Sequence, residues 1–265
     1  MTTPLNHSAG SRKLYASVHS AIAQFGLVAS GDHILVAVSG GTDSLLMLEA
    51  LWRYRNNLRD DFRMTAVHIV AEGVDYSIDR NALTQFCTDR GIELLFRGFE
   101  FVKTEKSLKS PCFYCSWHRR KQLYALSREL GCNRLALGHH ADDALETLML
   151  NMCRHKSISS LPALLPMFSG RLSVIRPLIL LYKQELTEIA ETLQLQAMVT
   201  RCSFADDTNR HKAKSLIDEA ERLFPGARAR MFASLSSVHE KYLPCKLGES
   251  PIVSGLNEIH PGNGD

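Results

Sequence analysis

The chain of 265 residues is long enough for one large domain with an appendage, and its 45% hydrophobic and 22% charged residues are close to the average of a globular protein. This composition excludes a disordered chain, a collagen-like repeat and a disulfide miniprotein, and no apolar run is long enough to cross a bilayer. The net charge of +3 is too small to indicate a nucleic-acid partner by itself. The first residues lack the apolar segment of a secretion signal, which predicts a cytoplasmic protein without a membrane partner.

Strands and helices are predicted to alternate along most of the chain. Apolar residues at helical spacing predict an opening helix, and further helices are expected at 45–54, 78–90, 116–130, 142–153 and 182–193. Short apolar runs predict strands at 33–38, 64–69, 92–96, 134–137 and 173–175, with a weaker pattern at 196–199. Strands joined by helices form right-handed crossovers. The pattern therefore predicts an α/β fold with a doubly wound, mostly parallel five-stranded sheet.

Four parts are predicted along the chain. The opening helix occupies 1–27, the α/β domain occupies 28–205 and a helical C-terminal segment occupies 206–242. Residues 243–265 contain several Pro and Gly residues, so we expect a poorly ordered tail there.

A glycine-rich motif follows the first predicted strand and consists of Ser39, Gly40, Gly41, Thr42, Asp43 and Ser44. Two glycines allow a tight turn that brings backbone N–H groups against an oligophosphate, and the following helix adds the positive end of its dipole. The lysine and the spacing of a Walker A loop are absent. The motif predicts a phosphate-binding loop, and the alternative interpretation is an ordinary strand-to-helix turn.

A second polar motif follows the fourth predicted strand and consists of Gly138, His139, His140, Ala141, Asp142 and Asp143. His68 likewise lies at the carboxyl end of the second predicted strand. Ligands of parallel sheets bind beyond the carboxyl ends of the strands, which is where these side chains are expected. The alternative is structural, because two carboxylates at the start of a helix can serve as N-caps.

Cysteines form the third feature. The chain has seven cysteines, an odd number, so they cannot all be paired in disulfides. Cys112 and Cys115 form a C-x-x-C motif, and Cys202 lies far downstream. Three thiolates suit an iron–sulfur cluster, but a zinc site that includes His118 and a redox dithiol fit the spacing equally well. The remaining cysteines have no motif and are mostly expected to be small buried residues: Cys87, Cys132, Cys153 and Cys245.

The S-G-G-T-D-S motif resembles the hallmark of the PP-loop ATP pyrophosphatase superfamily, which has the adenine nucleotide alpha hydrolase-like fold. That resemblance implies that Ser39–Ser44 binds the β,γ-pyrophosphate of ATP and that Asp43 lies near the phosphates and their Mg²⁺. It also implies that the nucleotide is bordered by His68, Gly138, His139 and Asp142. Asp142 or Asp143 would orient Mg²⁺ or the attacking group.

Together with C-x-x-C-S-x-x-R-R and Ile175-Arg176-Pro177-Leu178, these motifs resemble the tRNA 2-thiocytidine synthetase family. The resemblance implies a [4Fe-4S] cluster held by Cys112, Cys115 and Cys202. It also implies tRNA as substrate, a cysteine desulfurase or another sulfur donor, and a chain that can form a homodimer. Thr42 stands where these enzymes commonly have lysine.

The function expected from this resemblance is adenylation of the C2 oxygen of a pyrimidine, cytidine first, and its replacement by sulfur with release of AMP and pyrophosphate. The basic runs 119–121 and 210–214 would hold the tRNA backbone, and the alternative for both is a solvated helix face. The alternatives for the whole chain are a uridine 2-thiolase, a lysidine synthetase, or a non-catalytic sensor that binds nucleotide and cluster.

Overall fold

The computed structural model describes residues 8–58, 61–74, 76–100, 111–200 and 208–242. Two compact units are present, and each is considered by itself: the first combines Met1–Ala144 with Leu161–Thr208, and the second combines Leu145–Ser160 with Asn209–Asp265. Cys202, Cys245 and the predicted tail lie outside the described residues.

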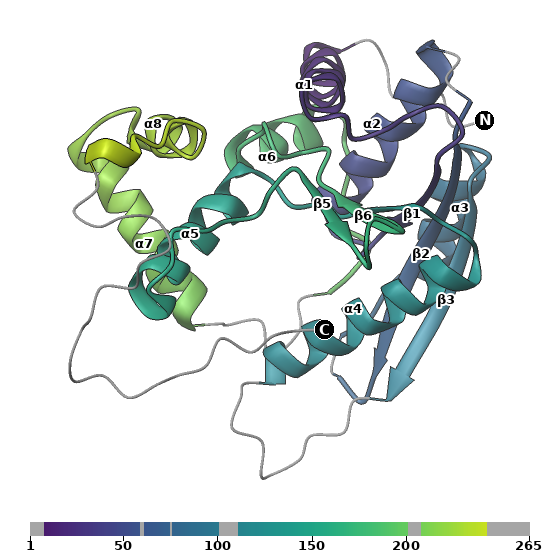
Figure 1. The fold of residues 1–265 in the computed structure, drawn as a ribbon. Helices are drawn as coiled ribbons and strands as arrows, with labels where there is room; N and C mark the ends of the chain where they lie inside the picture. Colours follow the sequence, from purple (N-terminus) through teal and green to yellow (C-terminus); the bar gives the residue numbers. More distant parts are fainter. Residues whose placement is uncertain (1–7, 59–60, 75, 101–110, 201–207, 243–265) are drawn as a thin grey trace. The chain divides into compact units, whose positions relative to one another are not determined.

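A six-stranded sheet in the order β3-β2-β1-β4-β6-β5 forms the centre of the first unit (Figure 1). The strands are β1 (His33–Ala37), β2 (Arg63–Glu72), β3 (Glu93–Glu100), β4 (Arg134–Ala136), β5 (Leu164–Met167) and β6 (Leu172–Ile175). All neighbours are parallel except β5 and β6, which are antiparallel. The predicted α/β class and the mostly parallel sheet are confirmed, but the strand count of five was one too low.

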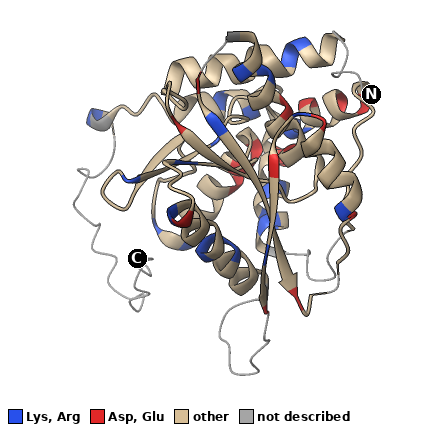
Figure 2. Ribbon diagram, turned by 90° about the vertical axis from the view of Figure 1, so that its right-hand side faces the viewer, with Lys and Arg blue, Asp and Glu red and all other residues tan. Residues whose placement is uncertain are grey.

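The central strands are apolar because both faces of the sheet are covered. In β1, Ile34, Leu35 and Val36 are fully buried, and their register pairs them with β2 on one side and β4 on the other. Such continuous apolar runs are typical of parallel strands between two helical layers. In Figure 2 most of the strand ribbon is accordingly free of charged residues, which concentrate on helices and at strand ends.

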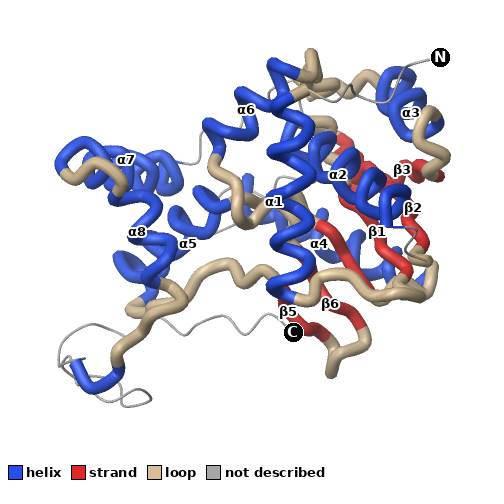
Figure 3. Tube along the Cα trace, turned by 90° about the horizontal axis from the view of Figure 1, so that it is seen from above, coloured by secondary structure: helices blue, strands red, loops and turns tan. Residues whose placement is uncertain are grey.

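Five helices belong to the first unit: α1 (Ala9–Phe25), α2 (Thr42–Leu58), α3 (Arg80–Thr88), α4 (Pro111–Glu129) and α6 (Lys183–Thr192). α1, α2 and α6 contact one another, and Figure 3 shows α1 and α2 together on one side of the strands. α4 instead packs on β2, β3 and β4, since the connection from β3 to β4 reverses the direction of the winding. The two layers place α2 and α4 on opposite faces of the sheet (Figure 1).

Two local predictions need correction. Helix α4 begins at Pro111 rather than Ser116, so Cys112 and Cys115 lie in its first two turns and not in a loop. Proline is favoured at the first helical position, where its fixed φ suits the helix and its missing N–H costs nothing. The weak strand pattern at 196–199 yields only an isolated bridge between Val199 and Ile78.

The second unit is helical and contains most of α5 (Ala141–His155), α7 (Thr208–Leu223), α8 (Ala227–Ser234) and the short 3-10 helix η1 (Glu240–Tyr242). The turn from α7 to α8 is held by Glu221, whose carboxylate accepts the N–H groups of Gly226 and Arg228, each at 2.7 Å. Arg210 of the predicted basic run lies 3.6 Å from Glu146 within this unit. Among the described residues, no helix has the length and apolar character that a membrane span requires.

Candidate active site

The S-G-G-T-D-S loop connects β1 to α2, and its serine hydroxyls fix its shape. Ser44 Oγ donates to the Gly41 carbonyl at 2.8 Å and accepts the Ser39 N–H at 3.2 Å. Gly40 has φ of +87°, and a Cβ there would lie 2.5 Å from Ile78 Cδ1, so glycine is required. Thr42 starts α2. The loop therefore presents a helix N-terminus, which is a favourable environment for a phosphate.

The second motif lies against this loop. A Cβ on Gly138 would come within 3.3 Å of the Ser44 backbone, so the absence of a side chain lets the two segments approach closely. The following residues are held by Asp143, whose carboxylate accepts the His140 N–H at 3.0 Å. His139 is half-buried between Gly138 and this turn. The structure thus brings together the two motifs that the sequence predicted to meet.

Three carboxylates surround the buried ring of His140. Its Nε2 lies 3.4 Å from Asp143 Oδ2 and 3.9 Å from Asp43 Oδ2, and its Nδ1 lies 3.8 Å from Asp142 Oδ2. Asp142 is buried and also accepts the backbone N–H of Lys183 at 2.6 Å. Asp142 and Asp143 therefore position the surrounding backbone, whereas Asp43 projects from the phosphate loop itself.

Lys183 is a site residue that the sequence analysis missed. Its Nζ donates to both carboxylate oxygens of Asp43, at 2.7 and 2.8 Å, although its side chain is half exposed. The loop Ser39–Ser44 contains no Lys or Arg of its own. Lys183, the first residue of α6, thus brings a cation to the loop.

His68, near the middle of β2, is buried behind the loop. Its Nδ1 lies 2.8 Å from the carbonyl of Val38, which assigns the proton to Nδ1 and makes Nε2 an acceptor. Within the described residues Nε2 has no hydrogen-bond partner. Burial lowers the pKa of His68, and the charges of Arg119 and Arg80 lower it further, so the ring is neutral at neutral pH. A neutral buried acceptor of this kind suits a ligand that brings an N–H donor.

The depressed pKa of His68 predicts a loss of stability on mild acidification. The unfolded chain binds a proton near the ordinary pKa of 6.5 and the folded chain only below it, so the free energy of unfolding falls as the pH drops below about 6.5. Urea denaturation at pH 7.5 and 5.5 measures this change. His68→Asn should reduce the pH dependence, to which His33, whose pKa burial also lowers, contributes as well. An unchanged pH dependence in His68→Asn would contradict this assignment.

The cysteine motif occupies the side of α4 that faces the sheet. Cys112 and Cys115 are half-buried and one helical turn apart, so their side chains lie on the same side of α4. Arg119 follows on that side, with its guanidinium 5.4 Å from the Tyr76 ring. The Tyr76 ring in turn lies 6.4 Å from the ring of His68. These contacts connect the cysteine face of α4 to the end of β1, where the phosphate loop begins.

The chemistry of the donors fits the two predicted inorganic groups. Thiolates at positions i and i+3 of a helix can bind one metal centre, and the partly exposed Asp43 carboxylate suits Mg²⁺, which keeps several waters and needs only one or two carboxylates. Over the ranges that the structure describes, no three His, Cys, Asp or Glu side chains form a ready metal site. Burial instead raises the pKa of the Cys87 and Cys132 thiols to about 11, which makes both unsuitable as ligands.

Known proteins of one family match this sequence over most of its length. The model of the PP-loop domain family ATP_bind_3 matches residues 13–213. A tRNA-cytidine(32) 2-sulfurtransferase of Pelobacter propionicus is 35% identical over 239 residues, which cover 88% of each chain. Another, from Aeromonas hydrophila subsp. hydrophila, is 32% identical over 88% of this chain and 78% of its own.

The fold also has a close counterpart among solved structures. The U34-tRNA thiolase NcsA of Methanococcus maripaludis, solved with its [4Fe-4S] cluster, superposes with a TM-score of 0.71 at 23% identity, over 87% of this chain and 80% of that one. This likeness shows a shared architecture. The sequence matches show that the chain belongs to the PP-loop domain family and, within it, to the family of the tRNA-cytidine(32) 2-sulfurtransferases.

Proposed function

We propose that this protein is an ATP-dependent, iron–sulfur-dependent tRNA thiolase that acts on cytidine. The family relationship supports the substrate class. The observation that carries the proposal is the set of contacts from Val38 through His68, Tyr76 and Arg119 to helix α4. They connect a phosphate-binding loop and a cysteine pair within one compact unit, as a reaction that activates and then thiolates one nucleobase requires.

ATP is proposed to bind at the S-G-G-T-D-S loop with its β,γ-pyrophosphate at the N-terminus of α2. Asp43 would hold Mg²⁺, which when bound neutralises charge on the phosphates. Lys183 then leaves Asp43 and binds a phosphate oxygen, supplying the cation that the loop lacks. Gly138, His139 and Asp142 border the nucleotide, and the Nε2 of His68 is available to a donor from it.

The chemical step begins at the C2 oxygen of cytidine, which carries no proton that must first be removed. This oxygen attacks the α-phosphorus of ATP, an O–P bond forms, and pyrophosphate leaves. The C2 oxygen thereby becomes part of a phosphate ester and a good leaving group. A hydrosulfide-level sulfur then bonds to C2, the C–O bond breaks, and AMP and a proton leave without any net oxidation.

Cys112, Cys115 and Cys202 are proposed to hold the iron–sulfur cluster. A [4Fe-4S] cluster with three protein thiolates has one iron without a protein ligand, which can carry the sulfur to be transferred. Reduced thiols fit a cytoplasmic protein, and the sulfur would come from a donor such as a cysteine desulfurase. A homodimeric assembly is also part of this proposal, by resemblance to the family.

The modified nucleoside identifies the reaction. We expect tRNA from a deletion strain to lack 2-thiocytidine, and expression of the wild-type chain to restore it, as measured by mass spectrometry of tRNA digests. If 2-thiouridine disappears while 2-thiocytidine remains, the enzyme is a uridine 2-thiolase on the same scaffold. If both persist, the thiolation proposal fails.

A further inference from the structure

Helix α4 has a largely exposed side opposite its cysteines. Five residues at steps of four, four, three and four lie along one side of the helix and form what we call the α4 stripe: Phe113, Trp117, Lys121, Tyr124 and Arg128. Phe113 is 39% exposed and Trp117 is 44% exposed. Cys115, Leu123 and Leu126 lie on the other side of α4 and pack in the core. Phe113 and Trp117 therefore do not fill the core of the first unit, whereas the half-buried Tyr124 packs partly against it.

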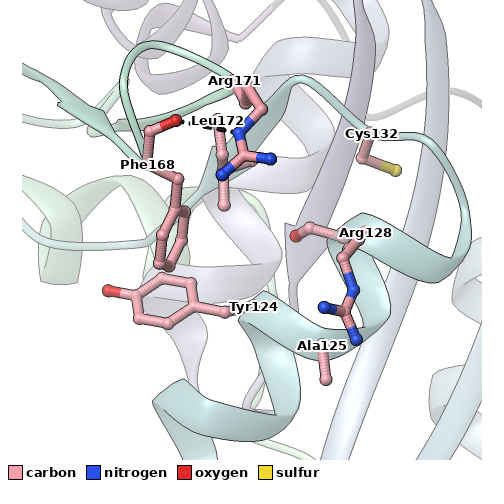
Figure 4. Close-up of a pocket in the computed structure, with 8 residues that line it drawn as sticks. Tyr124, Ala125, Arg128, Cys132, Phe168, Arg171 and Leu172 are labelled. Atoms are coloured by element: carbon pink, nitrogen blue, oxygen red, sulfur yellow. Dashed lines mark hydrogen bonds between the residues drawn. The ribbon is translucent and has the colours of Figure 1, made fainter. Parts of the chain in front are cut away.

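A pocket of about 330 Å³ lies at the C-terminal end of this stripe, between α4 and the turn from β5 to β6. Its lining includes Tyr124 and Arg128 of the stripe together with Phe168, Arg171 and Leu172. The Tyr124 and Phe168 rings meet edge to face with centroids 5.5 Å apart. Figure 4 shows these two rings together, with Arg128 across the pocket from them.

No carboxylate of the described residues neutralises the positive charges of the pocket. Arg171 Nε donates to the Phe168 carbonyl at 3.1 Å, and within the described residues neither Arg171 nor Arg128 forms an ion pair with a carboxylate. By contrast, Glu129, the neighbour of Arg128, is bound to Arg97. Two guanidinium groups beside the exposed Phe168 ring match a phosphate next to an unstacked base. The volume is close to the lower limit of ligand pockets and suits about one nucleotide.

The pocket is separate from the site that binds ATP. Leu172 starts β6, and Cys132, which also lines the pocket, precedes β4. The phosphate loop follows the C-terminal end of β1. Because β1, β4 and β6 are parallel, the pocket lies at the N-terminal ends of these strands and the loop lies at their C-terminal ends. Arg128 lies 13 residues beyond Cys115, which is about 20 Å along the helix axis.

We propose that the α4 stripe and this pocket bind an unpaired segment of RNA, with bases stacked on the aromatic rings and phosphates held by Arg128 and Arg171. The continuity of stripe and pocket favours a strand of nucleotides over a single free one, and stacking requires bases that are not paired. The inference rests on the proposed function for the identity of this RNA as the tRNA substrate. The target nucleotide would lie at the cysteine end of α4 and the neighbouring nucleotides along its length.

Binding of unmodified tRNA to the full chain, measured by fluorescence anisotropy from 50 to 300 mM salt, tests the proposal. We expect Trp117→Ala to weaken binding about tenfold and Trp117→Phe to bind nearly as the wild type does, because a stacking face is kept. Arg128→Ala/Arg171→Ala should lower the slope of log affinity against log salt by about 0.7 for each arginine. Arg55→Ala, which removes a charge from α2 on the other face of the sheet, is the matched control and should leave the slope unchanged.

Two results would overturn this proposal: stripe and pocket variants that bind tRNA with wild-type affinity and salt slope, or a Trp117→Ala variant that loses a dimer while its tRNA affinity is unchanged. ATP affinity should be the same in all variants, since the pocket is remote from the loop. The test also separates the two proposals. A wild-type chain that binds tRNA through the stripe but forms no thionucleoside would refute the proposed reaction and leave the RNA site standing.

Discussion

Asp43→Asn is expected to abolish tRNA-dependent pyrophosphate release while the fold and the iron content stay intact. Asp43 is the carboxylate of the phosphate loop, and an amide cannot hold Mg²⁺ against the phosphates. The loss should exceed about a hundredfold, because even outer-shell partners of a metal typically contribute 10- to 100-fold. Lost contact with the half-exposed Lys183 should change stability little, as surface ion pairs contribute little. Pyrophosphate assay and thermal denaturation measure the two effects, and wild-type release by this variant would remove Asp43 from the mechanism.

Lys183→Met shows whether Asp43 and Lys183 act together. The expected result is a raised KM for ATP with a smaller change in kcat, because the lysine binds phosphate without taking part in bond breaking. Lys13 offers a matched control, since its side chain is 47% exposed and forms an ion pair with Glu185 of α6 at 2.8 Å. Lys13→Met should leave the KM for ATP unchanged. Equal effects of the two substitutions would mean that Lys183 acts only through the placement of α6.

Cys112→Ser is expected to eliminate thiolation and the bound iron, while pyrophosphate release persists. A serine hydroxyl is a poor ligand for a cluster that needs thiolates, whereas the phosphate loop lies on other elements. Iron and sulfide analysis after anaerobic purification, with the visible spectrum, measures the loss. Cys153→Ser changes an exposed cysteine of α5 and should affect neither the iron content nor the thiolation. A Cys112→Ser protein that thiolates at the wild-type rate would end the cluster proposal.

The parts of the site that could be predicted from the sequence are those that local chemistry determines. The S-G-G-T-D-S loop and the motif that begins at Gly138 are both short and contiguous in the sequence. Each follows a parallel strand, and the carboxyl ends of parallel strands lie together, so the two motifs are predicted to meet. The close approach of Gly138 to Ser44 confirms that meeting.

The features that were missed depend on tertiary contacts. Lys183 and Asp43 are 140 residues apart, and a lysine at the start of a helix has no motif of its own. Strand β5 contains Pro166, which argues against a strand except at an edge, and β5 is at the edge of the sheet. The α4 stripe could not be predicted because apolar and charged residues are mixed around the whole circumference of α4, so no side of the helix stands out in the sequence.

The stoichiometry of the reaction shows whether activation of the C2 oxygen by ATP is coupled to its replacement by sulfur. Cluster-loaded protein should be mixed anaerobically with Mg²⁺, ATP, a sulfide source and unmodified tRNA, and pyrophosphate and 2-thiocytidine measured together. One pyrophosphate should be released for each 2-thiocytidine formed, and no 2-thiocytidine should form without ATP. Formation of 2-thiocytidine in the absence of pyrophosphate release would contradict this coupling, because sulfur would then replace an oxygen that had never been activated.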